Sequence, residues 1–196
     1  MLMLTLAALL SKGLPLPGQD VGTEPAKIIF LTAEDGLADT VKPRLVQDCE
    51  RILVIDDSDT PLTILDERLE MAILREHAKL LILDPLQAFL GADVDMHRAN
   101  EVRPAFRRLA GVAERTGCAI VIVGHMNKMQ GAKGIYRGLG SIDITAVVRS
   151  LLFIGKVKND PTTRVLIHEK SSLAPPGKSL AFSLGDDCGF QWIGEY

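Results

Sequence analysis

The chain carries three polar side chains at points where an apolar segment ends. Glu34, Asp84 and His125 each follow such a segment. A carboxylate can hold the water shell of magnesium, or orient and deprotonate an attacking water, and an imidazole can contact a terminal phosphate. These residue types together favour phosphoryl-transfer chemistry, provided that the fold brings them to one place.

The segment before Asp84 gives the clearest structural signal. Residues 80–83 are all apolar, and the acid that follows them is followed at once by Pro85. Such a bounded apolar run is typical of a strand buried on both faces of a parallel sheet. Asp84 would then emerge at the carboxyl end of the strand, where open α/β sheets bind their ligands. This is the Walker B arrangement of a magnesium-nucleotide site.

Each of these residues also has an ordinary interpretation. An acid before a proline, as at Asp84, can be a turn or helix-cap residue. Glu34 can belong to a solvated loop, and His125 can be a structural or surface histidine. Asp56 ends the apolar run 52–55 and matches the same hydrophobic-acid pattern. The pattern alone therefore does not choose between the two acids.

The first 150 residues alternate between strand-like and helix-like segments. Apolar runs indicate strands, and amphipathic or apolar stretches bounded by glycine and proline indicate helices. Alternation of this kind predicts a mostly parallel sheet with helices on both faces, so that the three polar residues share one edge. We expect strands at 27–31, 51–55, 80–83 and 118–123, and helices at 1–12, 37–50, 65–77 and 100–116.

The sequence pattern changes after residue 150, where short strand-like segments follow one another with no helix-like segments between them. This favours antiparallel strands that extend the sheet. We therefore expect a single α/β domain over 1–196, with an α/β core over 1–150 and a β extension over 151–196. The predicted strands of the extension are 151–154, 164–168, 180–184 and 190–193.

Composition narrows the class of protein. The chain has 196 residues, of which 47% are hydrophobic and 24% charged, which is typical of a globular domain. Its net charge of -3 means that any contact with nucleic acid must be local. Its three cysteines form no CxxC pattern, which indicates reduced thiols and no zinc site. The histidines show no ligand spacing, so we expect no transition-metal site.

The apolar start of the chain, residues 1–10, raises the question of a leader or membrane segment. It has no positively charged region before it and no small-residue cleavage site after it. It is also too short to cross a bilayer. We therefore expect a cytoplasmic protein without a membrane contact.

Three motifs in order carry a resemblance to a known family. They are residues 27–35, 80–86 and 120–128. Together they resemble the RecA-like ATPases, most closely the RepA-type hexameric replicative helicases of plasmids and phages, over nearly the whole chain. The resemblance implies a three-layer RecA-like P-loop NTPase fold, ATP and Mg²⁺ as cofactors, a hexameric ring, and a role in DNA replication. It also places Asp56 on a neighbouring strand without a magnesium role.

The resemblance implies a role for each candidate residue. Asp84 resembles the Walker B aspartate on the magnesium side, and Glu34 resembles the glutamate that activates water. His125 resembles the sensor of the γ-phosphate. Arg149 resembles the arginine finger that one subunit inserts into its neighbour's site, where it neutralises charge in the transition state. Arg137 is a second candidate for that role, and a surface arginine before a strand is the ordinary interpretation of Arg149.

The glycine-rich segment 127–140 is the candidate DNA contact. It contains Lys128, Lys133, Tyr136 and Arg137. In the family, the corresponding loop faces the channel of the ring and touches single-stranded DNA. Cations and an aromatic ring on a flexible backbone suit phosphate contacts and base stacking. A surface loop without this role is the alternative.

The phosphate-binding loop GxxxxGK[ST] has no counterpart in the sequence. The GKS at 177–179 lacks the earlier glycine and is followed by a strand-like segment, which predicts a tight turn. In the resemblance, residues 1–10 correspond to the helix after the loop, and the strand before the loop lies inside the sheet. Without that strand we expect an unpaired edge, and we expect this chain to bind ATP poorly.

Three explanations for the absent loop remain open. The start codon is assigned too late, the gene is a truncated relic, or the chain is a non-hydrolysing module that assembles with other subunits. Three functional hypotheses also remain open. The chain is an ATP-dependent DNA helicase or translocase domain, a recombinase-like filament former, or an interaction module without hydrolysis.

Overall fold

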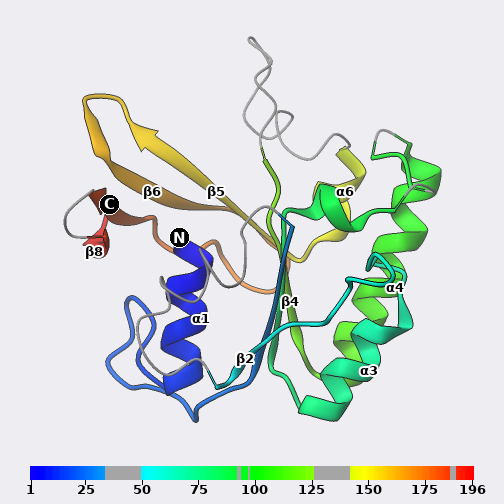
Figure 1. The fold of residues 1–196 in the computed structure, drawn as a ribbon. Helices are drawn as coiled ribbons and strands as arrows, with labels where there is room; N and C mark the ends of the chain where they lie inside the picture. Colours follow the sequence, from blue (N-terminus) through cyan, green and yellow to red (C-terminus); the bar gives the residue numbers. More distant parts are fainter. Residues whose placement is uncertain (34–49, 92–93, 97, 126–141, 186–188) are drawn as a thin grey trace.

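The computed structural model describes residues 1–33, 50–91, 94–96, 98–125, 142–185 and 189–196 (Figure 1). Within these ranges the chain is an α/β protein with a four-stranded parallel sheet and a four-stranded antiparallel sheet. The helices are α1 (Leu2–Lys12), α3 (Glu67–Glu76), α4 (Ala99–Thr116) and α6 (Ile142–Val147), with a 3₁₀ helix η2 (Leu86–Phe89). The strands are β1 (Ile28–Thr32), β2 (Ile52–Leu53), β3 (Leu80–Asp84), β4 (Ala119–Ile122), β5 (Ser150–Val157), β6 (Asp160–Ser171), β7 (Leu180–Gly185) and β8 (Gly189–Glu195).

The parallel sheet has the strand order β2-β1-β3-β4. Its two central strands, β1 and β3, are apolar and buried at their first four positions and end in a polar residue. Because such strands hide both faces, the sheet must be covered on both sides. The predicted α/β class and parallel pairing are therefore confirmed, and β3 ends at Asp84 as expected.

Helices cover both faces of this sheet (Figure 1). On one face, α3 and α4 contribute Leu69, Ile73, Phe106 and Leu109 to the larger core cluster, which also includes Leu83. On the other face, α1 packs Leu4 and Ala7 against Ile28, Phe30 and Ile82, which form a second cluster. The sheet with its two helical layers has the three-layer arrangement expected from the sequence.

Local signals explain where the helices begin and end. α1 ends before Gly13, which adopts the left-handed conformation at φ 69° that glycine tolerates at a helix C-cap. α3 begins after Asp66, whose side chain accepts a hydrogen bond from the Arg68 N–H. No described helix has the length and apolar character needed to span a membrane.

The strands beyond residue 150 form a sheet of their own. Their order is β5-β6-β7-β8, and every neighbouring pair is antiparallel. The sequence correctly indicated four antiparallel strands, but the expectation that they extend the first sheet is wrong for the residues described. No described strand pairs with the outer edge of β4 or of β5, and the two sheets therefore remain separate.

The predicted elements differ from the observed ones in two further respects. β2 pairs with β1 only at Ile52 and Leu53, although a longer strand over 51–55 was expected. Val54 is 46% exposed, and the chain leaves the sheet there. The predicted helix at 37–50 falls almost wholly outside the described residues and stays a prediction.

Candidate functional site

The candidate site is the carboxyl edge of the parallel sheet. Asp84, the last residue of β3, is in register with Thr32, the last residue of β1. The Ala33 N–H donates to the Asp84 carbonyl oxygen at 3.3 Å, which joins the two strand ends. Parallel strands present their carboxyl ends at the same edge, so Thr32 and Asp84 lie side by side there.

β4 delivers the next polar residue to the same edge. The Val123 N–H donates to the Leu83 carbonyl oxygen at 2.9 Å, and the Leu86 N–H donates to the Val123 carbonyl oxygen at 2.8 Å. These bonds hold the exits of β3 and β4 together, and His125 follows two residues after Val123. Asp84 is half-buried and His125 is exposed. The structure thus brings two of the three sequence-predicted residues to one edge.

The third predicted residue, Glu34, lies outside the described residues. The same holds for the four predicted DNA-contact residues, Lys128, Lys133, Tyr136 and Arg137. Their roles remain predictions. Ala33, the last described residue before Glu34, bonds to Asp84 at this edge.

The rival acid, Asp56, is exposed and serves a local turn. Its carboxylate accepts hydrogen bonds from the Ser58 N–H at 3.1 Å and from the Ser58 hydroxyl at 2.7 Å. These bonds favour the ionised form and lower the pKa of Asp56. A small hollow of about 40 Å³ lies nearby, between β1 and the chain after β2, and Thr32, Asp57 and Phe89 are among its lining residues.

Magnesium fits the donor type that this edge offers. Mg²⁺ prefers oxygen ligands, keeps several waters, and is usually held by one or two carboxylates together with substrate phosphates. The Asp84 carboxylate and the Thr32 hydroxyl are such donors, and they are in register. Within the described ranges, no cluster of three or more His, Cys, Asp or Glu side chains forms a complete metal cage. A metal at this edge would therefore depend on phosphate and water ligands.

Arg149, the predicted arginine finger, lies at the entrance to the antiparallel sheet. It is exposed and immediately precedes β5, and its carbonyl oxygen accepts a hydrogen bond from the Ser172 N–H at 2.9 Å. It therefore precedes a strand of the antiparallel sheet, whereas Asp84 ends a strand of the parallel sheet. Its role as an arginine finger stays a prediction.

Sequence reasoning missed the residue that holds the turn before Arg149. The Lys170 ammonium group donates to the carbonyl oxygens of Thr145, Ala146 and Val148, at 2.8, 3.1 and 2.8 Å. A cation at the C-terminal end of α6 satisfies carbonyl groups that the helix leaves unpaired. The partners of Lys170 lie more than twenty residues earlier in the chain, so no local motif could have revealed them.

His168 forms a second set of hydrogen bonds beside this turn. Its Nδ1 accepts a hydrogen bond from the Gly177 N–H at 2.8 Å, which assigns the proton to Nε2. That Nε2 lies 2.9 Å from the Ser150 Oγ at the start of β5. His168 therefore ties the 174–179 turn to the beginning of β5.

The parallel sheet covered by helices, the separate antiparallel sheet and the acid at the β3 exit define a protein with the fold of a RecA-like ATPase. The chain belongs to the AAA domain family, whose profile matches residues 1–131. Among solved structures, it resembles the crystal structure of the RadB recombinase, with a TM-score of 0.60 and 16% sequence identity. That alignment covers 96% of this chain and 82% of the RadB chain, and it supports the fold. A search of curated protein sequences found no match.

Proposed function

We propose that this chain is the ATPase domain of an ATP-dependent DNA helicase or translocase of the RepA type, which acts as a hexameric ring in the replication of a plasmid, phage or other mobile element. The observation that carries the proposal is the shared edge of Asp84 and His125 in a member of the AAA domain family. An acid and an imidazole at neighbouring strand exits match the chemistry of a magnesium-nucleotide site.

The proposed roles follow from the chemistry of each side chain. Bound magnesium would neutralise charge on the phosphates, and Asp84 would hold it through a carboxylate oxygen or an ordered water. Glu34 would orient the attacking water and accept its proton. His125 would contact the γ-phosphate, and Arg149 would reach the site of a neighbouring subunit. The exposed position of Arg149 supports this last role.

One edge of β4 is covered by no described strand, and this bears on how the phosphates would be held. β4 is an apolar strand, but none of its residues is buried, whereas β1 and β3 are buried at four positions each. Ile120 and Ile122 pack toward one core cluster, and Val121 packs toward the other. An apolar strand with an open edge suits pairing with a further strand. We propose that such a strand, outside residues 1–196, carries the phosphate-binding loop.

A binding and hydrolysis experiment tests this proposal. The 196-residue chain is compared with a version extended at its amino end by an in-frame strand and a GxxxxGK[ST] loop, using a fluorescent ATP analogue and a phosphate-release assay. We expect the extended protein alone to bind Mg-ATP tightly and to hydrolyse it. Tight Mg-ATP binding and turnover by the 196-residue chain itself would contradict the proposed division of the site.

Asp84 and the rival acid Asp56 provide a matched pair of variants in the extended protein. Asp84→Asn should abolish magnesium-dependent hydrolysis, because it removes the carboxylate from the β3 exit. Asp56→Asn should leave hydrolysis unchanged, because Asp56 is committed to its turn with Ser58. Equal losses in both variants, or none in Asp84→Asn, would refute the assignment of the magnesium side.

The likeness to the RadB recombinase favours a second candidate, a recombinase-like ATPase that forms filaments. Sizing chromatography with nucleotide distinguishes the two assemblies. A closed hexamer supports the helicase, and an open-ended size distribution supports the filament. A chain that neither assembles nor binds ATP under any condition supports a non-hydrolysing interaction module.

A further inference from the structure

The β5–β6 hairpin is a long ribbon that extends away from the parallel sheet (Figure 1). Its two strands pair from Ser150 and Ser171 at the base to Val157 and Asp160 at the tip. β7 covers only residues 163–166 of β6, and no described strand covers the outer edge of β5. The ribbon therefore presents a free strand edge to the surroundings.

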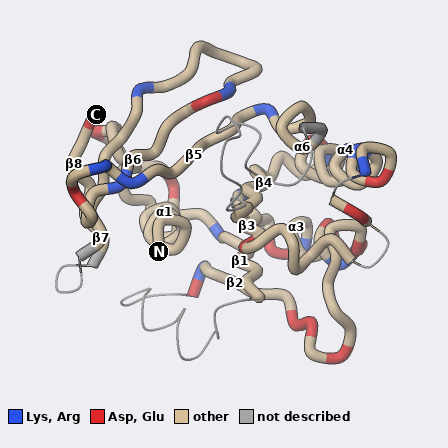
Figure 2. The backbone as a smooth tube through the Cα atoms, turned by 90° about the horizontal axis from the view of Figure 1, so that it is seen from above, with Lys and Arg blue, Asp and Glu red and all other residues tan. Residues whose placement is uncertain are grey.

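Positive charge gathers at the outer end of this ribbon. Lys156 and Arg164 are directly opposite each other across the two strands, and Lys158 lies in the turn. Like charges at opposed positions repel each other unless something neutralises them. The nine residues from 156 to 164 carry three cations and one acid, a net charge of +2, in a chain of net charge -3. Figure 2 shows blue segments along this ribbon, beside the label of β6.

The one acid at the tip does not neutralise these cations. The Asp160 carboxylate accepts hydrogen bonds from the hydroxyl and N–H groups of Thr162 and Thr163, at 2.6 to 3.1 Å. Among the described residues, Lys156 and Lys158 form no ion pair or side-chain hydrogen bond. The tip therefore presents cations that remain available to an external anion.

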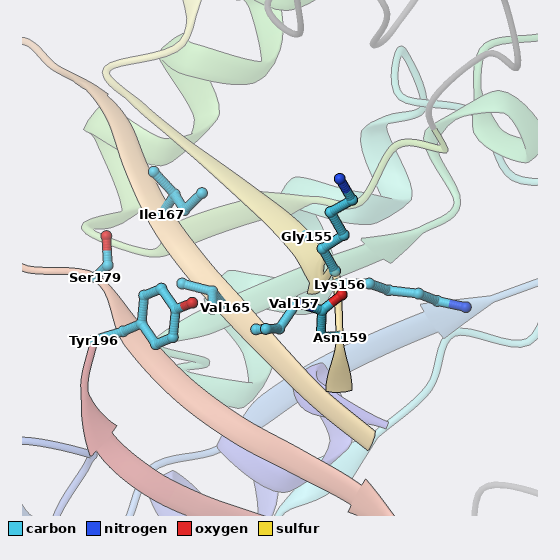
Figure 3. A pocket seen from close by; sticks show the side chains of 9 residues that line it. Gly155, Lys156, Val157, Asn159, Val165, Ile167, Ser179 and Tyr196 are labelled. Atoms are coloured by element: carbon cyan, nitrogen blue, oxygen red, sulfur yellow. The ribbon is translucent and has the colours of Figure 1, made fainter. Parts of the chain in front are cut away.

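A hollow of about 500 Å³ lies against the same ribbon, and Lys158 and Asn159 are part of its lining. Its apolar side is formed by Val157, Val165 and Tyr196, and Figure 3 shows the Tyr196 ring beside Val165. The volume is within the range of small-molecule sites. Tyr196 is 70% exposed, so that its ring is open to a planar partner.

The hollow and part of the cationic group adjoin each other on the ribbon. Lys156 and Lys158 both line the hollow, and Lys156 pairs with Arg164 across the two strands. The side chain of Lys156 extends away from Tyr196 (Figure 3). An extended polymer on this surface can therefore contact the lysine side chains with one segment and Tyr196 with another.

We propose that the β5–β6 ribbon binds single-stranded nucleic acid, with backbone phosphates at Lys156, Lys158 and Arg164 and a base stacked on Tyr196 in the hollow. Cations combined with an exposed aromatic ring are the recurring elements of single-strand recognition without sequence preference. The proposal takes its partner class from the proposed function, but it needs neither ATP nor the predicted loop over 127–140.

The test measures the affinity of the 196-residue chain for fluorescein-labelled oligo(dT) as a function of salt, without nucleotide. Lys156→Ala/Lys158→Ala should weaken binding and reduce the slope of log K against log salt by about 1.4, because each lost phosphate contact contributes about 0.7. Tyr196→Ala should weaken binding at least about fivefold through the lost stacking, with the slope unchanged. Tyr196→Phe should restore binding, because it keeps the ring.

Lys12→Ala/Lys79→Ala is the matched control, since it removes two exposed lysines that are distant in sequence from the ribbon. It should leave affinity and slope at their original values. An abasic oligonucleotide should respond to the lysine variants but not to Tyr196→Ala. Circular dichroism confirms that each variant is folded before its affinity is compared.

Several results would overturn the proposal. They are no binding of oligo(dT) by the original chain, unchanged binding by the ribbon lysine variant, or an equal loss in the control variant. Stronger binding of duplex DNA or of an acidic peptide than of oligo(dT) would also overturn it. Failure of the proposed ATPase function is distinguishable from these results. In that case, Asp84→Asn would leave ATP hydrolysis by the extended protein unchanged.

Discussion

The two sheets of this protein bury their strands to different degrees. In the parallel sheet, β1 and β3 are buried at every position except their last residues, Thr32 and Asp84. In the antiparallel sheet, exposed and half-buried positions alternate along β5, where Leu152 and Ile154 are 51% and 48% exposed. The first sheet therefore positions polar groups at one edge, whereas the second presents side chains along its length.

The antiparallel sheet has a local core in place of a second layer of helices. Phe182 is 1% exposed and contacts Phe190 and Trp192, with ring centroids 5.0 and 5.7 Å apart. All three residues belong to one hairpin, β7–β8. The parallel sheet draws its core from segments far apart in the chain, and this contrast predicts different responses to mutation.

The largest expected effect is in the central strand of the parallel sheet. Ile82 is fully buried between the layers, and Ile82→Ala should reduce the free energy of unfolding by roughly 2–5 kcal/mol, through lost burial and a residual cavity. Ile154→Ala on the exposed side of β5 should cost less than about 1 kcal/mol. Urea unfolding measures both. Equal losses would show that the antiparallel sheet is covered by something else in solution.

The next effect concerns the connection between the two sheets. Lys170→Met should cost about 1.5–3 kcal/mol, because three carbonyl groups at the end of α6 lose a charged donor. Hydrogen exchange should accelerate in α6, and unfolding in urea gives the total. Lys178→Met is the control, since the exposed Glu195 carboxylate is the partner of its ammonium group among the described residues and this pair should contribute less than about 1 kcal/mol. A control loss as large as that of Lys170→Met would contradict the argument.

The same contrast explains what the sequence could predict. Continuous apolar runs such as 28–31 and 80–83 indicate buried parallel strands by their composition alone, and their common direction predicts that the residues after them share one edge. The register of Thr32 with Asp84 was not predicted. The antiparallel strands were also predictable, but their separation from the first sheet was not. Strand pairing depends on backbone groups that are far apart in the chain. The local sequence of β5 therefore does not reveal which strand it pairs with.

The candidate site shows a similar division. Asp84 and His125 were predictable because each ends an apolar run, and the structure places both at one edge. The structural hydrogen bonds of Lys170 and His168 were not predicted, because their partners lie in other elements. Long-range side-chain bonds of this kind leave no periodic signal in a sequence.

A smaller effect tests whether a local capping residue determines where α3, in the helical layer over the parallel sheet, begins. Asp66→Ala should destabilise the protein by about 1 kcal/mol, since it removes the acceptor for the Arg68 N–H at the start of α3. Asp66→Asn retains a side-chain oxygen and should cost less. Thermal unfolding ranks the three proteins. An undiminished stability of Asp66→Ala would show that packing of Leu69 and Ile73 alone determines where α3 begins.

The smallest effect is a pH dependence at the exposed tip of the antiparallel sheet. Hydrogen bonds from Thr163 and Thr162 favour the ionised carboxylate and lower the pKa of Asp160 from 3.8 to about 2. A depressed folded-state pKa means that this stabilisation is fully present above pH 3.8 and is lost as the pH falls through about 2. NMR titration of the Asp160 carboxyl carbon should give a midpoint near that lower value, and Asp160→Asn should remove the dependence. A midpoint near 3.8 would mean that Thr162 and Thr163 do not hold the Asp160 carboxylate by hydrogen bonds in solution. The carboxylate would then be able to pair with the neighbouring cations.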